Sequence, residues 1–268
     1  MPARGFGPTI SPWEVRLIPS PIRKVLFLIR KSRVQALLMG GQACVLYGGA
    51  EFSRDTDLAV LADAGNLGNL QRALDELAAL PIAVPPFEQR FLELGLAVPF
   101  RCQHADCAGM RIDVMSKMRG VAPFGDLWAR RTTLETEEGA IEMLSLPDLV
   151  QSKKTQCEKD WPMIARLVEA SYFEPRPDRS SELIQFWLRE LRTAKLLIRV
   201  TSDYRTEAEH LKTERPLLEI ALQSPADEAS LRAALKQEEE HEREADRQYW
   251  QPLCAELERL RRETRKQR

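Results

Sequence analysis

Residues 34–61 read VQALLMGGQACVLYGGAEFSRDTDLAVL and combine two apolar runs with a glycine pair and two acidic side chains. The first apolar run, 34–39, predicts a buried strand, and Gly40-Gly41 closes it. A short helix is expected after the glycines. The second apolar run predicts another strand, which opens with Asp55 and Asp57. The segment therefore predicts a strand, a glycine turn, a helix, and a strand that begins with paired carboxylates.

The paired carboxylates indicate phosphate chemistry. Side chains two residues apart on a strand point to the same face, so Asp55 and Asp57 would project together, as a divalent metal site requires. Gly40 and Gly41 would let backbone amides approach a phosphate at a helix N-terminus. The alternative is a tight glycine turn followed by two solvated loop aspartates. Aspartate is depleted in strands, and this favours the functional interpretation.

This pattern resembles the signature of the nucleotidyltransferase superfamily, in which a glycine pair is followed after a short gap by Asp-x-Asp. Gly40 and Gly41 match its first half, and Asp55 and Asp57 match its second. The superfamily usually adds a third carboxylate from a later strand, and Asp113 interrupts the apolar run at 110–115. The resemblance implies that the three aspartates bind Mg²⁺, that an NTP is the substrate, and that the glycines bind the nucleotide. We expect these residues to converge on one cleft at the edge of a mixed sheet.

A second segment, LSLPDLVQSKK at 144–154, is followed by Lys159-Asp160. Together they resemble the AbiEii-like nucleotidyltransferases, which are toxins of bacterial toxin–antitoxin systems. That resemblance implies that Lys153 contacts phosphate and that Asp160 is a further acidic site residue. Lys154 is the neighbouring candidate, and the alternative is that both lysines lie on a solvated helix. Arg54 would either contact the nucleotide phosphate or balance the carboxylates.

Two positions depart from the AbiEii-like pattern. Trp161-Pro162-Met163 stands where relatives often carry a second acidic residue, and Gln42 stands where many have a small hydroxyl residue. Neither departure removes a metal ligand. They affect the acceptor and the nucleotide preference, which the resemblance therefore does not specify.

The composition is that of an ordinary soluble protein. The chain has 268 residues, a formal net charge of −1 and 29% charged residues. No overall basic field indicates nucleic-acid binding, so such binding would depend on local patches. The longest apolar runs fall far short of the ~20 residues that span a bilayer. We expect a cytoplasmic protein that has no membrane partner.

The five cysteines show no regular spacing, which is typical of reduced thiols in the cytosol. Cys102, His104, Asp106 and Cys107 carry ligand types that bind zinc. No second ligand pair of matching spacing follows. The segment 104–109 also falls between two strand-like runs, so we interpret it as a polar hairpin turn.

The fold class expected is α+β: a nucleotidyltransferase-like mixed sheet with flanking helices, followed by a C-terminal helical region. The expected domains are an irregular arm at 1–21, a nucleotidyltransferase-like domain at 22–172 and a helical domain at 173–268. Besides the strands above, strands are expected at 91–101 and 140–144. Helices are expected at 22–32, 42–47 and 66–80, from about 146, at 160–170, 180–201 and 203–223, and at 226–264, with Pro216 and Pro252 bending or interrupting the last two.

Three functions are consistent with these residues. The first is transfer of a nucleotide to an RNA end, including that of tRNA, by a toxin that has an antitoxin protein as partner. The second is transfer to a small molecule such as an antibiotic, or to a protein side chain. The third is a catalytically inactive scaffold. The basic C-terminal end, 259–268, either attracts RNA or is a solubilising helix end.

Overall fold

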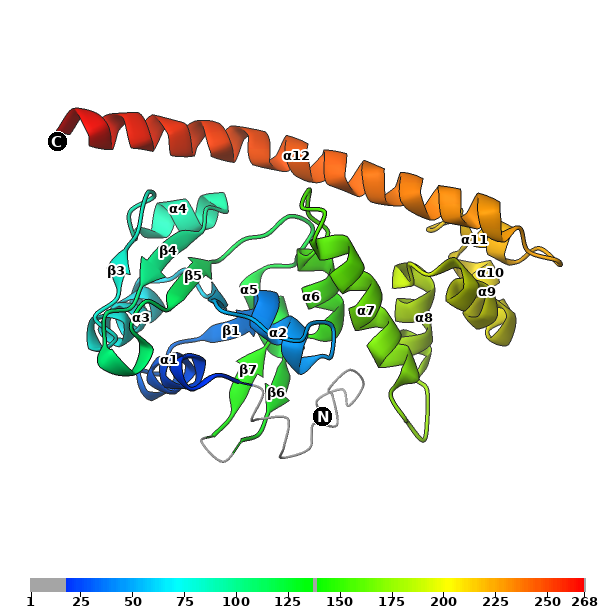
Figure 1. Cartoon of the computed structure of the whole chain (residues 1–268), viewed down its shortest axis with the longest axis horizontal. Helices are drawn as coiled ribbons and strands as arrows, with labels where there is room; N and C mark the ends of the chain where they lie inside the picture. The colour runs from blue at the N-terminus through cyan, green and yellow to red at the C-terminus, as the bar shows by residue number, and fades with distance from the viewer. Residues whose placement is uncertain (1–17, 137–138, 268) are drawn as a thin grey trace.

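The computed structural model describes residues 18–136 and 139–267 and has the expected α+β architecture (Figure 1). Its centre is one seven-stranded mixed sheet of order β3-β4-β5-β2-β1-β7-β6. The β2–β5 and β1–β7 pairs are parallel, and the other neighbours are antiparallel. The strands are β1 Ala36–Met39, β2 Thr56–Val60, β3 Leu80–Pro81, β4 Val98–Arg101, β5 Arg111–Met115, β6 Thr132–Leu134 and β7 Ile141–Met143.

Helices flank the sheet and then continue alone to the C-terminal end. No strand follows β7 in the described part of the chain, as expected. The first group is α1 Ser20–Lys31, α2 Gly40–Leu46, α3 Ala64–Glu76, α4 Gln89–Leu94, α5 Phe124–Ala129, α6 Leu146–Ser152 and α7 Asp160–Phe173. The second group is α8 Ser181–Glu190, α9 Ala194–Asp203, α10 Arg205–Leu211, α11 Leu218–Ala221 and α12 Glu228–Gln267.

The core explains why β1 and β2 form where the apolar runs predict them. All four residues of β1 are buried, and Asp57 is the one position of β2 that is only partly buried. An aspartate within such a strand is an exception to its apolar pattern. One cluster of buried side chains extends from Ile18 through the sheet to Leu235 of α12. The expected boundary after 172 falls at the end of α7 and remains a prediction, and the expected arm lies almost entirely outside the described residues.

The expected strand at 91–101 is wrong in its first half. Residues 89–94 form α4, and only 98–101 belong to a strand, β4. Gly95 ends α4 in the left-handed conformation with φ of +98°, which is a common way for a helix to terminate. The apolar residues of 91–101 therefore belong to a helix end and a strand, separated by Gly95. The hairpin itself is confirmed, because β4 and β5 pair around residues 102–110, where a short 3₁₀ helix lies.

Other elements were partly expected. β3 and β6 were not expected, whereas 203–223 is interrupted around Pro216 as expected and forms α10 and α11. Residues 180–201 were expected as one helix but form two, and Arg215 donates hydrogen bonds to the carbonyls of Leu188 and Leu191, where α8 ends. Pro252 does not interrupt α12, which is continuous.

The long helix α12 returns over the sheet. In Figure 1 it crosses the whole molecule, from α11 past α7 to a position above α4. Leu253 and Leu260 of α12 pack with Phe91 and Leu96 in a second, smaller apolar cluster. The C-terminal helix therefore covers one side of the sheet region. None of the described helices combines the length and apolar character needed to cross a membrane.

Candidate active site

The glycine turn packs directly against the carboxylate of Asp57. β1 and β2 are antiparallel neighbours, and Met39 lies opposite Asp57. Gly40 follows with φ of +65°, and a Cβ atom placed there would lie 1.8 Å from Oδ2 of Asp57. Only glycine allows so close an approach in this conformation. The Gly41 amide donates a long hydrogen bond of 3.4 Å to the same oxygen.

Asp113 lies beside Asp57 on the next strand. The two are register partners in the parallel pair β2–β5, so their side chains share one face of the sheet. Arg111 donates a hydrogen bond of 2.9 Å from Nε to Oδ1 of Asp113. Asp55 is exposed and precedes β2, which begins one residue later than expected. Because β5 and β2 are the third and fourth of seven strands, the site lies at the centre of the sheet, not at its edge.

The environment of Asp57 opposes its negative charge. Burial and the nearby Asp113 carboxylate raise the pKa of Asp57 from 3.8 to about 6, while Lys153 and the Gly41 amide act in the opposite direction. Asp55 adds a smaller repulsion. Three carboxylates thus influence one another at this point. A cation bound there would relieve the cost of keeping Asp57 ionised.

Lys153 and Asp160 form an ion pair next to this carboxylate. Lys153 is the C-cap of α6, and its Nζ lies 3.2 Å from Oδ1 of Asp160 at the start of α7. Thr155 donates a hydrogen bond of 2.6 Å to the other oxygen of Asp160. Burial alone would lower the pKa of Lys153, but Asp160, the Cys44 thiol and Asp57 together raise it. Lys153 is therefore a partly buried ammonium that stays charged, and it lies on a helix consecutive with that of Asp160, as expected.

A buried polar contact fixes α6 and thereby Lys153. The Ser145 hydroxyl caps the helix by accepting a hydrogen bond from the Asp148 amide. Arg130 donates two hydrogen bonds, of 2.8 and 2.6 Å, to the buried Asp148 carboxylate. A bidentate pair of this kind restricts the orientation of both groups.

The structure separates the two neighbouring lysines. Lys154 donates a hydrogen bond of 2.8 Å to Glu190 of α8, so its contact is with the C-terminal helices rather than with Asp160. Arg54 is exposed, and its guanidinium lies 5.2 Å from the ring centroid of Phe52. Both expected roles of Arg54 stay open.

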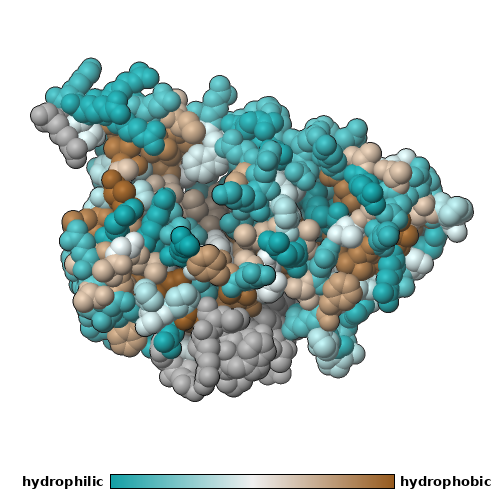
Figure 2. Space-filling view, viewed as in Figure 1, coloured by the Kyte–Doolittle hydropathy of each residue, from teal (hydrophilic) through white to brown (hydrophobic). Residues whose placement is uncertain are grey.

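One cleft, bounded on one side by α12, is lined by Asp57, Gly40 and Lys153. It holds about 670 Å³ of empty space, part of it open to solvent. Figure 2 shows a recess between α12 and the region beneath it. Among the other residues predicted for the site, Gly41, Arg54, Asp55, Asp113 and Asp160 do not line this cleft. The remaining lining residues are Met39, Met115, Lys117, Met118, Arg119, Gln151, Ser152, Lys154, Thr155, Asp246, Tyr249 and Trp250.

The sequence patterns did not assign Lys117, Arg119, Tyr249 or Trp250 to the site. Lys117 and Arg119 follow β5 within a short loop that carries no motif. Tyr249-Trp250 is an aromatic pair within the strongly charged helix α12, and this contrast is the one local signal that singles it out. Only the return of α12 over the sheet brings the pair to the cleft.

The donor set fits Mg²⁺ in chemical type. Magnesium prefers oxygen ligands and is commonly held by one or two carboxylates together with substrate phosphates. Among the described residues Asp57 forms no ion pair, although the Lys153 ammonium acts on it, and Asp113 lies beside it on the same face. Across residues 18–136 and 139–267, no three His, Cys, Asp or Glu side chains already form a metal-binding group. Cys102, His104, Asp106 and Cys107 are among the described residues that form no such group.

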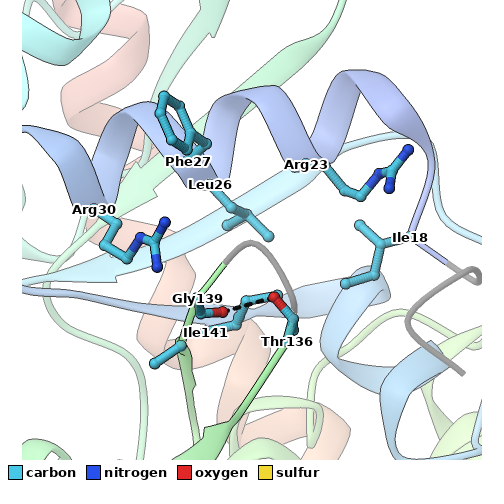
Figure 3. Close-up of a pocket in the computed structure, with 9 residues that line it drawn as sticks. Ile18, Arg23, Leu26, Phe27, Arg30, Thr136, Gly139 and Ile141 are labelled. Atoms are coloured by element: carbon cyan, nitrogen blue, oxygen red, sulfur yellow. Dashed lines mark hydrogen bonds between the residues drawn. The ribbon is translucent and has the colours of Figure 1, made fainter. Parts of the chain in front are cut away.

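A separate small pocket lies between α1 and the β6–β7 region (Figure 3). Leu26, Arg30, Ile141 and Thr136 are among its lining residues, and Thr136 donates a hydrogen bond of 2.7 Å to the Gly139 carbonyl. It contains none of the residues predicted for nucleotide chemistry. The cleft beneath α12 is therefore the candidate active site.

No protein-family model matches this chain, and neither does any curated protein sequence. Among solved structures, the chain is similar to an antigenic nucleotidyltransferase-like protein from Paracoccidioides brasiliensis. The two share 16% sequence identity over 79% of this chain and 92% of the other, with a TM-score of 0.37. At this TM-score the similarity is too weak to assign a function.

Proposed function

We propose that this protein is a magnesium-dependent nucleotidyltransferase that transfers a nucleotide from an NTP to an RNA acceptor, as the toxin of a toxin–antitoxin or phage-defence system. The observation that supports the transferase chemistry is the environment of the Asp57 carboxylate. Asp57 is a partly buried carboxylate with a raised pKa, it lies against a glycine turn, and it has Asp113 beside it and a charged lysine in the same cleft. The AbiEii-like spacing of the sequence supports the toxin assignment.

The residues have distinct tasks in this proposal. Asp57, Asp113 and Asp55 would hold Mg²⁺, which supplies charge neutralisation at the phosphates when bound. Lys153 would bind the triphosphate, and its ammonium would stabilise the negative charge that leaves with pyrophosphate. Gly40 and Gly41 would let the phosphates approach the backbone at the start of α2. Asp113 would accept the proton of the acceptor hydroxyl.

The reaction joins the acceptor oxygen to the α-phosphorus of the NTP. The bond between that phosphorus and the oxygen bridging to the β-phosphate breaks, and pyrophosphate leaves. Catalysis then depends on positioning and charge stabilisation rather than on a covalent enzyme intermediate.

A small-molecule acceptor is the second candidate, and α12 favours it. Three residues of α12, at 246, 249 and 250, line the same cleft as Asp57 and Lys153, so α12 bounds the space open to an acceptor. The basic end of α12 is also partly neutralised within the helix, because Arg259 pairs with Glu256 and Glu263. Such pairs reduce the local positive charge that RNA would sense.

Incubation with each labelled NTP, Mg²⁺ and total RNA tests the proposal. Label on RNA, lost in the Asp57→Asn variant, is the expected result. Label on small molecules or on protein would select the second acceptor class. No transfer with any of the four NTPs, under conditions where the protein stays folded, would refute the enzymatic proposal and favour a scaffold.

A further inference from the structure

We propose that the Tyr249-Trp250 pair of α12 forms the wall of a subsite that binds the base of the nucleoside triphosphate, an inference that rests on the proposed function. Both residues line the same cleft as Asp57 and Lys153. The cleft therefore offers carboxylate and ammonium groups together with two aromatic rings. A nucleoside triphosphate has the same division, since it joins a charged triphosphate to a flat base.

Besides its charged side chains the cleft has apolar ones, and these match a base. Met39, Met115 and Met118 contribute thioether side chains, which are polarizable and adapt to flat rings. Trp250 lies at 88° to Tyr249 with ring centroids 6.0 Å apart, so the two rings form a corner. A base gains affinity by stacking on an aromatic side chain, whichever base it is.

Two anchors fix the aromatic pair from opposite sides along α12. Before the pair, the buried Asp246 accepts hydrogen bonds from Arg119 Nε at 3.3 Å and from the Gln156 amide at 2.8 Å. After it, Leu253 and Leu260 are buried in the apolar cluster above α4. The helix is therefore held on the sheet region on both sides of Trp250. A wall that is already in place costs little ordering entropy when a ligand binds.

Contact with the sheet region also sets the position of Tyr249. Its hydroxyl lies so close to Gly95 that a Cβ atom on Gly95 would come within 2.5 Å of it. That hydroxyl has no hydrogen-bond partner among the described residues. Packing, not a polar contact, therefore holds Tyr249, and the Tyr249 ring packs in turn against Trp250. Trp250 is the ring that we assign to stacking.

Calorimetric titration of the 268-residue chain with ATP and, separately, with inorganic tripolyphosphate tests this assignment, with Mg²⁺ present and RNA absent. In Trp250→Leu we expect ATP affinity to fall on the order of tenfold or more, with tripolyphosphate affinity unchanged. Trp250→Phe retains a ring and should retain most of the ATP affinity. Leu260→Ala is the matched control, because Leu260 packs in the same cluster without lining the cleft.

The outcomes separate this inference from the proposed function. Unchanged ATP affinity in Trp250→Leu would overturn the subsite alone. A similar loss in Leu260→Ala would also overturn it, since it would show that loosening of α12 is the cause. Loss of affinity for an RNA oligonucleotide, with ATP affinity kept, would assign the aromatic wall to the acceptor and overturn the inference. If the wild type binds neither probe, the proposed nucleotide chemistry is refuted, and the subsite that rests on it is refuted as well.

Discussion

Replacing Asp57 by asparagine should stabilise the metal-free protein above pH 6 while abolishing nucleotide transfer. The pKa of Asp57 rises from 3.8 to about 6 in the folded protein, chiefly through burial and the Asp113 charge. The folded state therefore holds this proton more tightly than the unfolded chain, by roughly 3 kcal/mol. Asparagine keeps the shape of the side chain and cannot ionise. The variant therefore keeps the unfolding free energy that the wild type loses when Asp57 ionises.

The sign follows from the protons bound in each state. Between pH 3.8 and about 6 the folded protein retains the Asp57 proton and the unfolded chain has released it. The unfolding free energy therefore falls by up to ~1.4 kcal/mol for each pH unit in this window, and the loss is complete above it. Asp57 is only partly buried, so water reduces the effect. We expect Asp57→Asn to gain about 1–2 kcal/mol at pH 7.5 and almost nothing at pH 4.

Urea unfolding followed by circular dichroism, in the presence of a chelator, measures this difference at both pH values. The exposed Asp55 provides the control, because Asp55→Asn should leave the unfolding free energy nearly unchanged. Equal stability of Asp57→Asn and wild type at pH 7.5 would refute the reasoning. A gain that is the same at pH 4 would refute it too, since titration of Asp57 could not be its cause.

Three other substitutions have defined outcomes. Gly40→Ala should abolish transfer and lower the melting temperature, because its Cβ would lie 1.8 Å from Asp57, whereas Gly68→Ala, whose Cβ meets nothing within 4 Å, should be neutral or stabilising by up to ~1 kcal/mol. Lys153→Met should weaken NTP binding, more at low than at high salt in titrations at two ionic strengths, and more than Lys154→Met does, since Lys154 pairs with Glu190. Asp246→Asn should lower the unfolding free energy in urea by about 1–3 kcal/mol and increase hydrogen exchange in the second half of α12, and unchanged exchange there would contradict its anchoring role.

The parts of the fold that were predictable are those specified by neighbouring residues. The apolar run before Gly40 and the one after Asp57 became β1 and β2, which pair with each other as antiparallel neighbours. Asp113 was identifiable because an acidic side chain interrupts an alternating apolar run, and the register places it beside Asp57. In a strand with a buried face, the register decides which face each side chain occupies, so the position of an acidic residue in the apolar run fixes its place on the sheet.

Two of the parts that were missed depend on contacts distant in sequence. The end of α8 is satisfied by Arg215, which follows it by more than twenty residues, so no local pattern marks that break. The aromatic wall of the cleft depends on α12 returning to α4, a packing between residues near 91–96 and residues near 253–260. Tyr249 and Trp250 have no spacing that indicates a nucleotide site. The high charge content of α12 indicates a solvent-exposed helix face and not a ligand site.

A comparison among aspartates of this chain favours a functional role for Asp57 over a structural one. Asp148 accepts two hydrogen bonds from Arg130, and Asp246 accepts one from Arg119 and one from the Gln156 amide, so each buried charge has its donors. Asp57 has only the 3.4 Å contact from Gly41 among the described residues, and another carboxylate lies beside it. A side chain kept only for packing would be more stable as asparagine. Retention of the carboxylate at this cost is understandable if a cation and the phosphates it carries complete the site.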